Sequence, residues 1–298
     1  MTQFRQITII GTGLIGGSFG LATKKAGFRG KIVGCDRKQI LARAKKLRAI
    51  DVAIADPIHA CKGSDLIVLA TPVGGIIELI EKLAPHLSPH TLLTDVGSTK
   101  SEIMRVAQHA FEADAANRFL GGHPMAGKED SGIEFADAKL FTDAVWFLTP
   151  AADQTPRDAR VAAFSALLKK MGAKIIALDA AEHDRLCAWI SHVPQMLSTA
   201  LAAALVEEYG PKAPLLEAGG RALREMTRIA ASPYSMWRDI AITNKAQIAE
   251  ALMKVEQELA HIRENLDMRE LDEEFNRAHQ LKNAAHSKSK KKQLHSRT

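Results

Sequence analysis

The amino-acid sequence predicts an α/β fold, in which a doubly wound and mostly parallel sheet is followed by an all-helical C-terminal domain. Two observations lead to this fold class. In the first half of the 298-residue chain, short apolar runs alternate with longer runs that have helical spacing. Strands that alternate with helices form βαβ units and hence a parallel sheet. From about Pro156 onward the runs are long and helical, apart from one strand-like segment.

The alternation of the first half can be followed along the chain. Strands are predicted at 7–11, 31–36, 65–72 and 91–96, and helices at 14–27, 37–50, 73–87 and 98–111. Helix-stopping residues such as Gly27 and Pro85 punctuate these runs. Further strand-like segments at 119–122 and 144–150 add to the predicted sheet.

The second half is predicted to be helical and to contain the surface for a partner subunit. Besides a strand-like segment at 173–179, it holds a run at 185–210 that is apolar on most faces and a long amphipathic run at 245–282. A helix that is apolar all round is normally buried. In a second domain such a helix often packs against another copy, so we expect a homodimer through the helical domain.

Composition and charge limit the classes of protein to which the chain can belong. A hydrophobic content of 46% with 25% charged residues is ordinary for a globular protein. The three cysteines, Cys35, Cys61 and Cys187, are far apart and odd in number, which argues against a disulfide framework. The predicted strand at 7–11 leaves no room for a signal peptide. With no run of the length of a membrane span, these features predict a cytoplasmic protein without a membrane partner.

The net charge of +6 has a local origin. Six lysines and arginines and no acidic residue lie between Lys282 and Thr298, and the rest of the chain has 34 basic and 34 acidic residues. The basic end has no aromatic side chain on which bases could stack. We therefore predict a disordered, solubilising tail and expect no nucleic-acid partner.

The residues after the first predicted strand form a glycine-rich turn. Gly11, Gly13 and Gly16 give the pattern G-x-G-x-x-G between a strand and a helix. In a Rossmann-type fold the first glycine permits the tight turn, the second lets the backbone approach a pyrophosphate, and the third allows close helix–strand packing. Because the strand and the helix stand where this site needs them, the turn predicts a dinucleotide cofactor.

The end of the second predicted strand favours one dinucleotide over the other. Asp36 lies there, 25 residues after Gly11, where a carboxylate binds the ribose 2′-hydroxyl of NAD and repels the 2′-phosphate of NADP. The adjacent Arg37 is a residue that accepts a 2′-phosphate, so NADP stays open as the alternative. Thr71 and Pro72 end the third predicted strand, at the sheet edge where ligands bind. The predicted cofactor site comprises Gly11, Gly13, Leu14, Ile15, Gly16, Asp36, Arg37, Thr71 and Pro72.

These assignments predict three parts of the chain. Residues 1–152 are the dinucleotide-binding domain, residues 153–284 a helical domain for substrate binding and dimerisation, and residues 285–298 the basic tail.

A lone histidine, His123, stands in the glycine-rich segment FLGGHPMAGKEDSG, residues 119–132, and is predicted to lie in a loop. A metal is one interpretation of His123, but the sequence has no CxxC or HExxH pattern, and we predict no metal site. Hydride transfer from an alcohol without a metal needs a base for the hydroxyl proton, and a neutral imidazole supplies one near pH 7. Ser98, which follows the fourth predicted strand, is either the N-cap of the next helix or a functional side chain at the same sheet edge.

Six ordered motifs together resemble one family. They are GTGLIGGS (11–18), ATPV (70–73), DVGSTK (95–100), GGHPMAGKEDSG (121–132), SHVPQ (191–195) and MTRIAASPYSMWRDI (226–240). With them the chain is similar, from about residue 5 to 275, to the prephenate dehydrogenases of tyrosine biosynthesis, a family that includes arogenate and cyclohexadienyl dehydrogenases. The chain departs from the family pattern at 222–225, where it reads ALRE and the family usually reads Gly-Phe-(Arg/Lys)-Asp.

The resemblance implies roles for individual residues. His123 is similar to the catalytic histidine that is hydrogen-bonded to the 4-hydroxyl of the cyclohexadienyl ring, and Ser98 to the residue that orients that imidazole. His192 resembles the group near the ring carboxylate, and Arg228 the anchor of the side-chain carboxylate. Lys128 and Glu129 stand where the family has polar residues that gate the pocket.

The implied reaction is the NAD-dependent oxidative decarboxylation of prephenate to 4-hydroxyphenylpyruvate, with arogenate as the alternative substrate. Two rival hypotheses remain. A β-hydroxyacid dehydrogenase or imine reductase would need a lysine on a helix after Pro156, and we find no comparable feature. A regulator that binds NAD without turnover would not need His123.

Outside the family resemblance, several of these residues have structural interpretations. Taken alone, His192 is a satisfied core histidine and Arg228 a salt-bridge residue. The same holds for four further residues. His183 is interpreted as a helix-start residue, Arg238 as paired near Asp239 or across an interface, and Trp146 and Trp237 as core residues.

Overall fold

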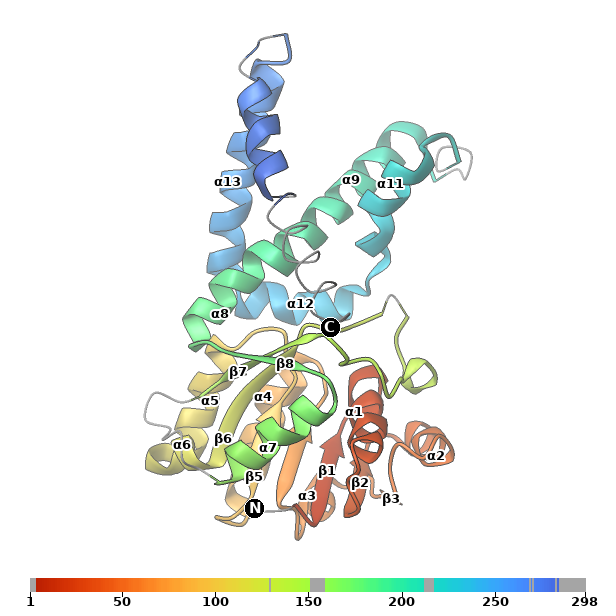
Figure 1. Cartoon of the computed structure of the whole chain (residues 1–298), viewed down its shortest axis with the longest axis vertical. Coiled ribbons are helices and arrows are strands. Elements are labelled where there is room, and N and C mark those ends of the chain that lie inside the picture. Colours follow the sequence, from red (N-terminus) through yellow and green to blue (C-terminus); the bar gives the residue numbers. More distant parts are fainter. Residues whose placement is uncertain are drawn as a thin grey trace, which may run out of the picture. The chain divides into compact units, whose positions relative to one another are not determined.

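The computed structural model describes residues 4–128, 130–150, 159–211, 217–267, 269, 271–281 and 283 (Figure 1). The chain divides into two compact units, Met1–Ile248 and Ala249–Thr298. The first unit contains the sheet and every residue of the candidate site discussed below, so the site can be described within one unit.

The first unit is built on a single sheet of eight strands. Their order across the sheet is β3-β2-β1-β4-β5-β6-β7-β8, and the bounds are β1 (Gln6–Ile10), β2 (Lys31–Cys35), β3 (Val52–Ala53), β4 (Leu66–Leu69), β5 (Leu92–Asp95), β6 (Phe119–Pro124), β7 (Val145–Thr149) and β8 (Lys174–Ala177). Strands β1 to β6 are parallel; β7 runs antiparallel to β6 and parallel to β8. The strand order reverses between β1 and β4, which makes the sheet doubly wound and confirms the predicted fold class.

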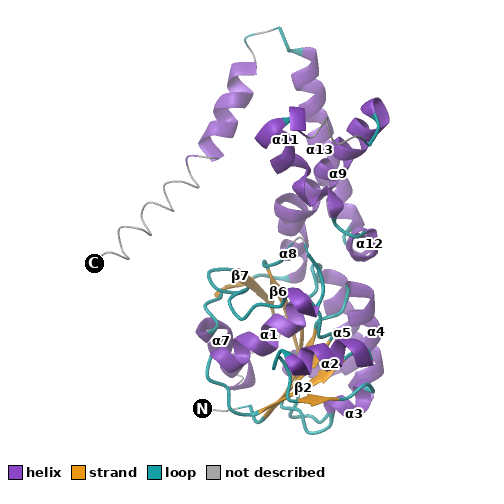
Figure 2. Cartoon of the chain, turned by 90° about the vertical axis from the view of Figure 1, so that its right-hand side faces the viewer, coloured by secondary structure: helices purple, strands orange, loops and turns teal. Residues whose placement is uncertain are grey.

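Helices cover both faces of this sheet (Figure 2). One apolar cluster joins the sheet to α1 (Leu14–Lys25), α2 (Lys38–Lys46) and α7 (Ala159–Lys170). A second cluster joins the other face to α3 (Pro57–Cys61), α4 (Val73–Leu83) and α5 (Ser101–Phe111). Short turns complete the layer: α6 (Ala115–Arg118), η1 (Ala84–His86), η2 (Glu112–Asp114) and η3 (Ile133–Phe135). Because both faces are covered, the strands are continuous apolar runs, as the sequence has them.

The remaining helices of the first unit begin directly after β8. They are α8 (Ala180–Cys187), α9 (Val193–Tyr209), α11 (Gly220–Thr227), η5 (Arg228–Ala231) and α12 (Tyr234–Thr243). A π-helical turn, η4 (Ala188–His192), joins α8 to α9. Pro194 stands just after it, and a proline ring cannot donate the usual backbone hydrogen bond within a helix. The π-helical winding of η4 accommodates the missing backbone hydrogen bond and places the side chain of His192 in the interior.

Helix α13 (Lys245–Glu264) crosses the division between the two units. Within the second unit its C-terminal half makes ion pairs with the helical residues that follow it. His261 lies 3.3 Å from Glu274, and Glu258 lies 3.9 Å from Arg277. The run predicted as one long helix at 245–282 is therefore helical at 245–264 and again at 271–281, with turn residues at 265–267 between them.

The apolar run at 185–210 differs from its prediction. We expected a buried helix, but only the beginning of α9 is buried, and Val206 and Tyr209 are exposed. By length and composition alone, Ala180–Tyr209 is apolar enough to cross a membrane. Its first part, however, carries the polar residues His183 and Asp184, which are buried in the first unit.

Two further expectations concern the ends of domains. The predicted boundary at 152 and the predicted tail at 285–298 lie outside the described residues. Beyond the boundary, α7 packs on the sheet and β8 is its eighth strand, so the sheet layer continues to Ala177. The three cysteines are all buried and free, and none forms a disulfide.

Candidate active site

The glycine turn lies between β1 and α1 and has two kinds of glycine. Gly11 has a φ of +90°, and a Cβ there would lie 2.4 Å from the carbonyl oxygen of Ala70. A Cβ on Gly16 would lie 1.9 Å from the carbonyl oxygen of Gly11. The fold itself therefore requires these two glycines. Gly13 differs, because a Cβ there would meet nothing within 4 Å. Its bare backbone faces open space at the N-terminus of α1, which fits a pyrophosphate.

Asp36 follows β2 and is tied to the same turn. Its Oδ2 accepts a hydrogen bond from the backbone amide of Thr12 at 2.7 Å, and its Oδ1 accepts one from the amide of Arg37. Beside it, a cavity of about 370 Å³ is lined by Arg37, Lys38, Gln39 and Ile40. A carboxylate held at the glycine turn and next to a cavity suits a ribose.

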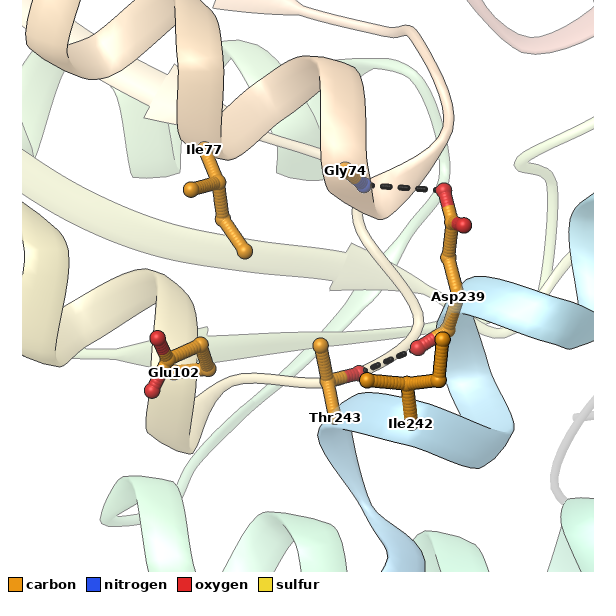
Figure 3. A pocket seen from close by; sticks show the side chains of 6 residues that line it. All are labelled: Gly74, Ile77, Glu102, Asp239, Ile242 and Thr243. Atoms are coloured by element: carbon orange, nitrogen blue, oxygen red, sulfur yellow. Dashed lines mark hydrogen bonds between the residues drawn. The ribbon is translucent and has the colours of Figure 1, made fainter.

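The β4–α4 connection carries Thr71 and Pro72 at the carboxyl edge of the sheet. Pro72 is the N-cap residue of α4, and the hydroxyl of Thr71 is buried without a hydrogen-bond partner among the described residues. Asp239 of α12 reaches this edge, where its Oδ2 accepts the backbone amide of Gly74 at 3.0 Å (Figure 3). A cavity of about 380 Å³ lies there, lined by Gly74, Ile77, Glu102, Asp239, Ile242 and Thr243. Arg238 pairs with Asp239 at 2.9 Å, as predicted.

The β5–α5 connection, which contains Ser98, is held by a buried ion pair. Lys100 and Asp95 are fully buried, and their side chains are hydrogen-bonded to each other. Asp95 also accepts the backbone amide of Gly97 at 2.8 Å and that of Gly122 at 3.0 Å. A Cβ on Gly122 would lie 2.6 Å from the carbonyl oxygen of Asp95, so only glycine lets β6 approach this loop. The hydrogen bonds of Asp95 and Lys100 thus hold the loop that contains Ser98 next to Gly122, the residue before His123.

His123 itself is part of a strand. We expected it in a loop, but β6 extends to Pro124 and His123 pairs with Phe147 of the antiparallel strand β7. Its ring is buried, and its Nδ1 lies 2.9 Å from Nε2 of His183. The other ring nitrogen of His183, Nδ1, lies 2.9 Å from Oδ1 of Asp184. Three polar side chains from β6 and α8 are therefore connected in series.

Asp184 caps helix α5. Its Oδ1 accepts the backbone amide of Lys100 at 2.7 Å and its Oδ2 that of Ser101 at 2.8 Å. We expected Ser98 to be a possible cap, but α5 begins at Ser101 and its cap comes from α8. Ser98 lies half-buried in the preceding loop. A carboxylate at a helix N-terminus is favoured by the helix dipole.

The pKa values of this cluster follow from burial and from its charges. Burial, together with His183, Lys100 and His192, holds the pKa of His123 well below its usual range. Burial alone would raise the pKa of Asp184, but its hydrogen bonds with His183, Ser101 and Lys100 lower it. At neutral pH the site therefore has a neutral imidazole at His123 and an ionised carboxylate at Asp184.

His192 forms a second polar centre close to the first. Its Nδ1 lies 3.2 Å from Nδ2 of Asn244, and that same amide nitrogen donates to the backbone carbonyl of Asp184 at 2.8 Å. The amide hydrogen makes Nδ1 the acceptor, so Nε2 carries the proton. Among the described residues Nε2 has no hydrogen-bond partner, and the same holds for Nε1 of Trp237, whose ring lies edge-on to His192. Burial lowers the pKa of His192 to about 4.

Two buried N–H donors without partners are a feature that a satisfied core histidine does not have. Such donors cost free energy unless a ligand or water accepts their hydrogens. The structural interpretation of His192 and Trp237 therefore leaves these two donor atoms without a partner among the described residues. Trp146 is fully buried in the apolar cluster, as predicted, and its Nε1 likewise has no hydrogen-bond partner among the described residues.

The remaining predicted site residues lie at the surface. Arg228 is exposed at the start of η5, whose next residue, Ile229, accepts a hydrogen bond from Gln195 at 2.9 Å. This bond joins the TRIA and SHVPQ motifs. Lys128 is exposed and donates to the backbone carbonyl of Phe135 at 2.9 Å. Glu129 lies outside the described residues.

One group of side chains has metal-ligating types, namely His123, His183 and Cys187. The Sγ of Cys187 lies 3.4 Å from Nε2 of His183 and 3.8 Å from Nδ1 of His123. Burial and the nearby Asp184 raise the pKa of the Cys187 thiol to about 12, so it is protonated at neutral pH. The 2.9 Å between Nδ1 of His123 and Nε2 of His183 is the length of a hydrogen bond between two imidazoles.

Two family models match consecutive parts of the chain. The prephenate dehydrogenase nucleotide-binding domain matches residues 19–177, and the prephenate dehydrogenase dimerization domain matches residues 179–281. The chain belongs to the prephenate dehydrogenase family. Membership removes the β-hydroxyacid dehydrogenase and imine reductase rival.

Individual prephenate dehydrogenases are similar over most of the chain. That of Lactococcus lactis is 37% identical over 244 residues, or 80% of this chain and 65% of that protein. That of Bacillus subtilis is 35% identical over 281 residues, or 92% of this chain and 74% of that protein. The crystal structure of prephenate dehydrogenase from A. aeolicus, in complex with hydroxyphenyl propionate and NAD+, has a TM-score of 0.84 at 29% identity and covers 97% of this chain and 98% of that one. The chain therefore spans about two thirds to three quarters of the two curated relatives.

Within this prephenate dehydrogenase fold, four polar residues of the site were not predicted. They are His183, Asp184, Asn244 and Lys100, and all are buried. The sequence could have indicated that two of them are buried. His183 and Asp184 precede an apolar helical run and lie on the same helix face as Cys187. No local signal marks Asn244, whose partners lie more than fifty residues away.

Proposed function

We propose that the chain is an NAD-dependent prephenate dehydrogenase that converts prephenate to 4-hydroxyphenylpyruvate in tyrosine biosynthesis. The observation that carries this proposal is the buried imidazole of His123 at the carboxyl edge of a dinucleotide-binding sheet. A base at this edge stands beside the place where a dinucleotide carries its reactive ring. Family membership supports the same reaction.

The cofactor site is proposed on the glycine turn. Gly11, Gly13 and Gly16, with Leu14 and Ile15 at the start of α1, hold the pyrophosphate, and Thr71 and Pro72 line the cleft. Asp36 binds the ribose hydroxyls, and its negative charge favours NAD over NADP. Arg37 lines the neighbouring cavity and is the residue through which NADP would bind. NAD, when bound, accepts the hydride that leaves C4 of the substrate.

The substrate is a dianion, and the proposed binding groups are donors. Nε2 of His192, which carries a proton, donates to the ring carboxylate. Nε1 of Trp237 is a second donor in the same place. Arg228 is proposed to bind the side-chain carboxylate, for which its planar guanidinium offers two parallel hydrogen bonds. Lys128 and Glu129 are proposed as polar residues of the pocket entrance.

His123 is the proposed catalytic base. It accepts the proton of the 4-hydroxyl while the hydride leaves the same carbon, and Ser98 orients the hydroxyl toward the imidazole. The ring carboxylate then departs as CO2, and its electron pair makes the ring aromatic. His123 returns the proton to the same oxygen, so no proton is consumed. Neutral His123 suits this role because a base must be unprotonated before it acts.

The proposed division of the chain keeps the two predicted roles but places the boundary after Ala177, where the sheet layer ends. The sheet part binds the dinucleotide, and the helical part binds substrate and forms a homodimer. The exposed apolar side chains of α9, with Val206 and Tyr209 among them, support a partner on that surface. We propose a cytoplasmic location, with no membrane or nucleic-acid partner.

An assay that crosses two substrates with two cofactors tests this function. Purified protein is incubated with prephenate or arogenate and with NAD+ or NADP+, and reduced cofactor is followed at 340 nm. We expect the highest kcat/KM for prephenate with NAD+. Preference for arogenate would replace the proposed substrate by the alternative. Binding of NAD+ without turnover of either substrate would favour the regulator that binds the cofactor alone.

A further inference from the structure

Behind His123 lies a chain of hydrogen bonds for which the proposed reaction gives no role. His123 Nδ1 and His183 Nε2 are 2.9 Å apart, and His183 Nδ1 and Asp184 Oδ1 are also 2.9 Å apart. The three residues are 7%, 0% and 2% exposed. We propose that His183 and Asp184 are positioning residues that set the tautomer of His123 and share the proton it accepts. This inference rests on the proposed role of His123 as the base.

The direction of the hydrogen bonds is determined at Asp184. Its carboxylate already accepts the backbone amides of Lys100 and Ser101 at the N-terminus of α5. An ionised carboxylate has lone pairs only, so the hydrogen between it and His183 belongs to Nδ1 of His183. The α5 cap therefore serves the histidine as well as the helix.

The tautomers of both histidines follow from this starting point. The proposal takes the His183 ring with a single N–H, on Nδ1, so Nε2 of His183 is an acceptor. The hydrogen between the rings then belongs to Nδ1 of His123, which leaves a lone pair on Nε2 of His123. That nitrogen has no hydrogen-bond partner among the described residues. The network thus presents His123 to the substrate in the form that accepts a proton.

The same network can take up the charge that the reaction creates. When Nε2 of His123 accepts the hydroxyl proton, a positive charge forms in a buried site close to Lys100. The proton on Nδ1 can pass along the hydrogen bond to Nε2 of His183, whose Nδ1–H faces the carboxylate of Asp184. The positive charge then lies next to a negative one. When the phenolic oxygen takes its proton back, both transfers reverse, so protons and charges balance.

A matched control is available in the same pocket. Cys187 touches both rings, but the proposed path does not run through it. Cys187→Ala therefore alters the packing around the histidines without breaking the series of hydrogen bonds. If a metal rather than a proton joined the two rings, the same substitution would remove a ligand and lower activity.

The first experiment determines which ring nitrogen of His123 carries the proton. Protein labelled with 15N at its histidines is examined by long-range 1H–15N correlation near pH 7, without substrate. We expect His123 with its proton on Nδ1 in wild type, and a change to Nε2 or to a mixture in His183→Leu. Wild-type His123 with its proton on Nε2 would overturn the proposal. Because this reading needs no turnover, it stands apart from any failure of the proposed function.

The second experiment compares His183→Leu, His183→Gln and Cys187→Ala in the prephenate assay. We expect kcat of His183→Leu to fall on the order of 10²-fold, with KM for prephenate changed about threefold or less. His183→Gln should recover about tenfold, because its amide oxygen accepts the hydrogen of Nδ1 but cannot carry a proton onward. Cys187→Ala should keep kcat. A His183→Leu variant that is folded by circular dichroism and fully active would refute the positioning role.

Discussion

The glycine turn and the histidine cluster belong to one candidate site but are built in opposite ways. The turn comes from six consecutive residues and leaves open space at Gly13, where the backbone itself meets the ligand. The cluster joins β6, α8 and the end of α12, and its side chains are buried and hydrogen-bonded to one another. Binding a phosphate needs only exposed backbone amides at a helix N-terminus. Setting a protonation state needs partners that are fixed from several directions.

The two regions also use charge differently. At the turn, Asp36 is half-buried and Arg37 is exposed, so both can respond to a ligand. In the cluster, Lys100, Asp95 and Asp184 are buried and mutually paired or hydrogen-bonded. Removing one member of such a network leaves an unpaired buried charge. The cluster is therefore expected to tolerate substitution far less well than the turn.

The largest effect is expected from the substitution that removes the base. His123→Asn should lower kcat by about 10²–10⁴-fold with KM for prephenate largely kept, because the amide cannot accept the hydroxyl proton. Steady-state kinetics at pH 7.5 measures this change. His86→Asn, at an exposed position in η1, is the control and should behave as wild type. Full activity of His123→Asn would show that the cluster has no part in proton transfer.

The neutral state of the cluster gives a stability effect that depends on pH. The pKa of His192 falls from 6.5 to about 4 on folding, so between these values the unfolded chain binds more protons than the folded one. The free energy of unfolding therefore falls as the pH decreases through this window. A shift of this size corresponds to about 3 kcal/mol, present above pH 6.5 and lost by pH 4.

Urea unfolding at pH 7 and at pH 4 measures this contribution. His192→Gln does not titrate, so its stability should decrease less than that of wild type between the two pH values, by about the same 3 kcal/mol. His86→Gln provides the comparison for an exposed histidine. An equal loss in His192→Gln and wild type would mean that His192 is not held neutral by burial.

The difference between the regions also explains what the sequence could predict. The fold class, the glycine turn and Asp36 follow from patterns of residues close together in the chain. The neighbours of His123 do not, because His183 is sixty residues away and meets it only after β6 and α8 have packed. His183 was interpreted as a helix-start residue because an isolated histidine near a helix start gives no hint of its partner. Asn244 could not be recognised for the same reason, because its partners Asp184 and His192 are distant from it in the sequence.

Local patterns failed in two further places for physical reasons. His123 was expected in a loop because glycine and proline surround it, but Gly122 is there for close approach to β5 and β6 runs through it. Ser98 was a candidate cap of α5, whereas the cap comes from Asp184. Glycines that serve packing and caps that come from another helix cannot be recognised from spacing alone.

In the turn, two glycines three residues apart should separate folding from binding. Gly16→Ala should lower the free energy of unfolding by about 3 kcal/mol, because its Cβ would meet the carbonyl oxygen of Gly11 at 1.9 Å. Gly13→Ala should change it by less than about 1 kcal/mol, since its Cβ meets nothing within 4 Å.

For NAD+ affinity, in contrast, substitution of Gly13 should have a larger effect than substitution of Gly16. A methyl group on Gly13 occupies the space proposed for the pyrophosphate, so Gly13→Ala should weaken NAD+ binding by about tenfold or more while the protein stays folded. Urea unfolding and calorimetric titration with NAD+ on the same samples measure both quantities. Unchanged affinity in Gly13→Ala would move the phosphate away from the turn. It would also mean that the glycine turn is not the part of the site that binds a ligand through its backbone, so the turn and the histidine cluster would no longer differ in that respect.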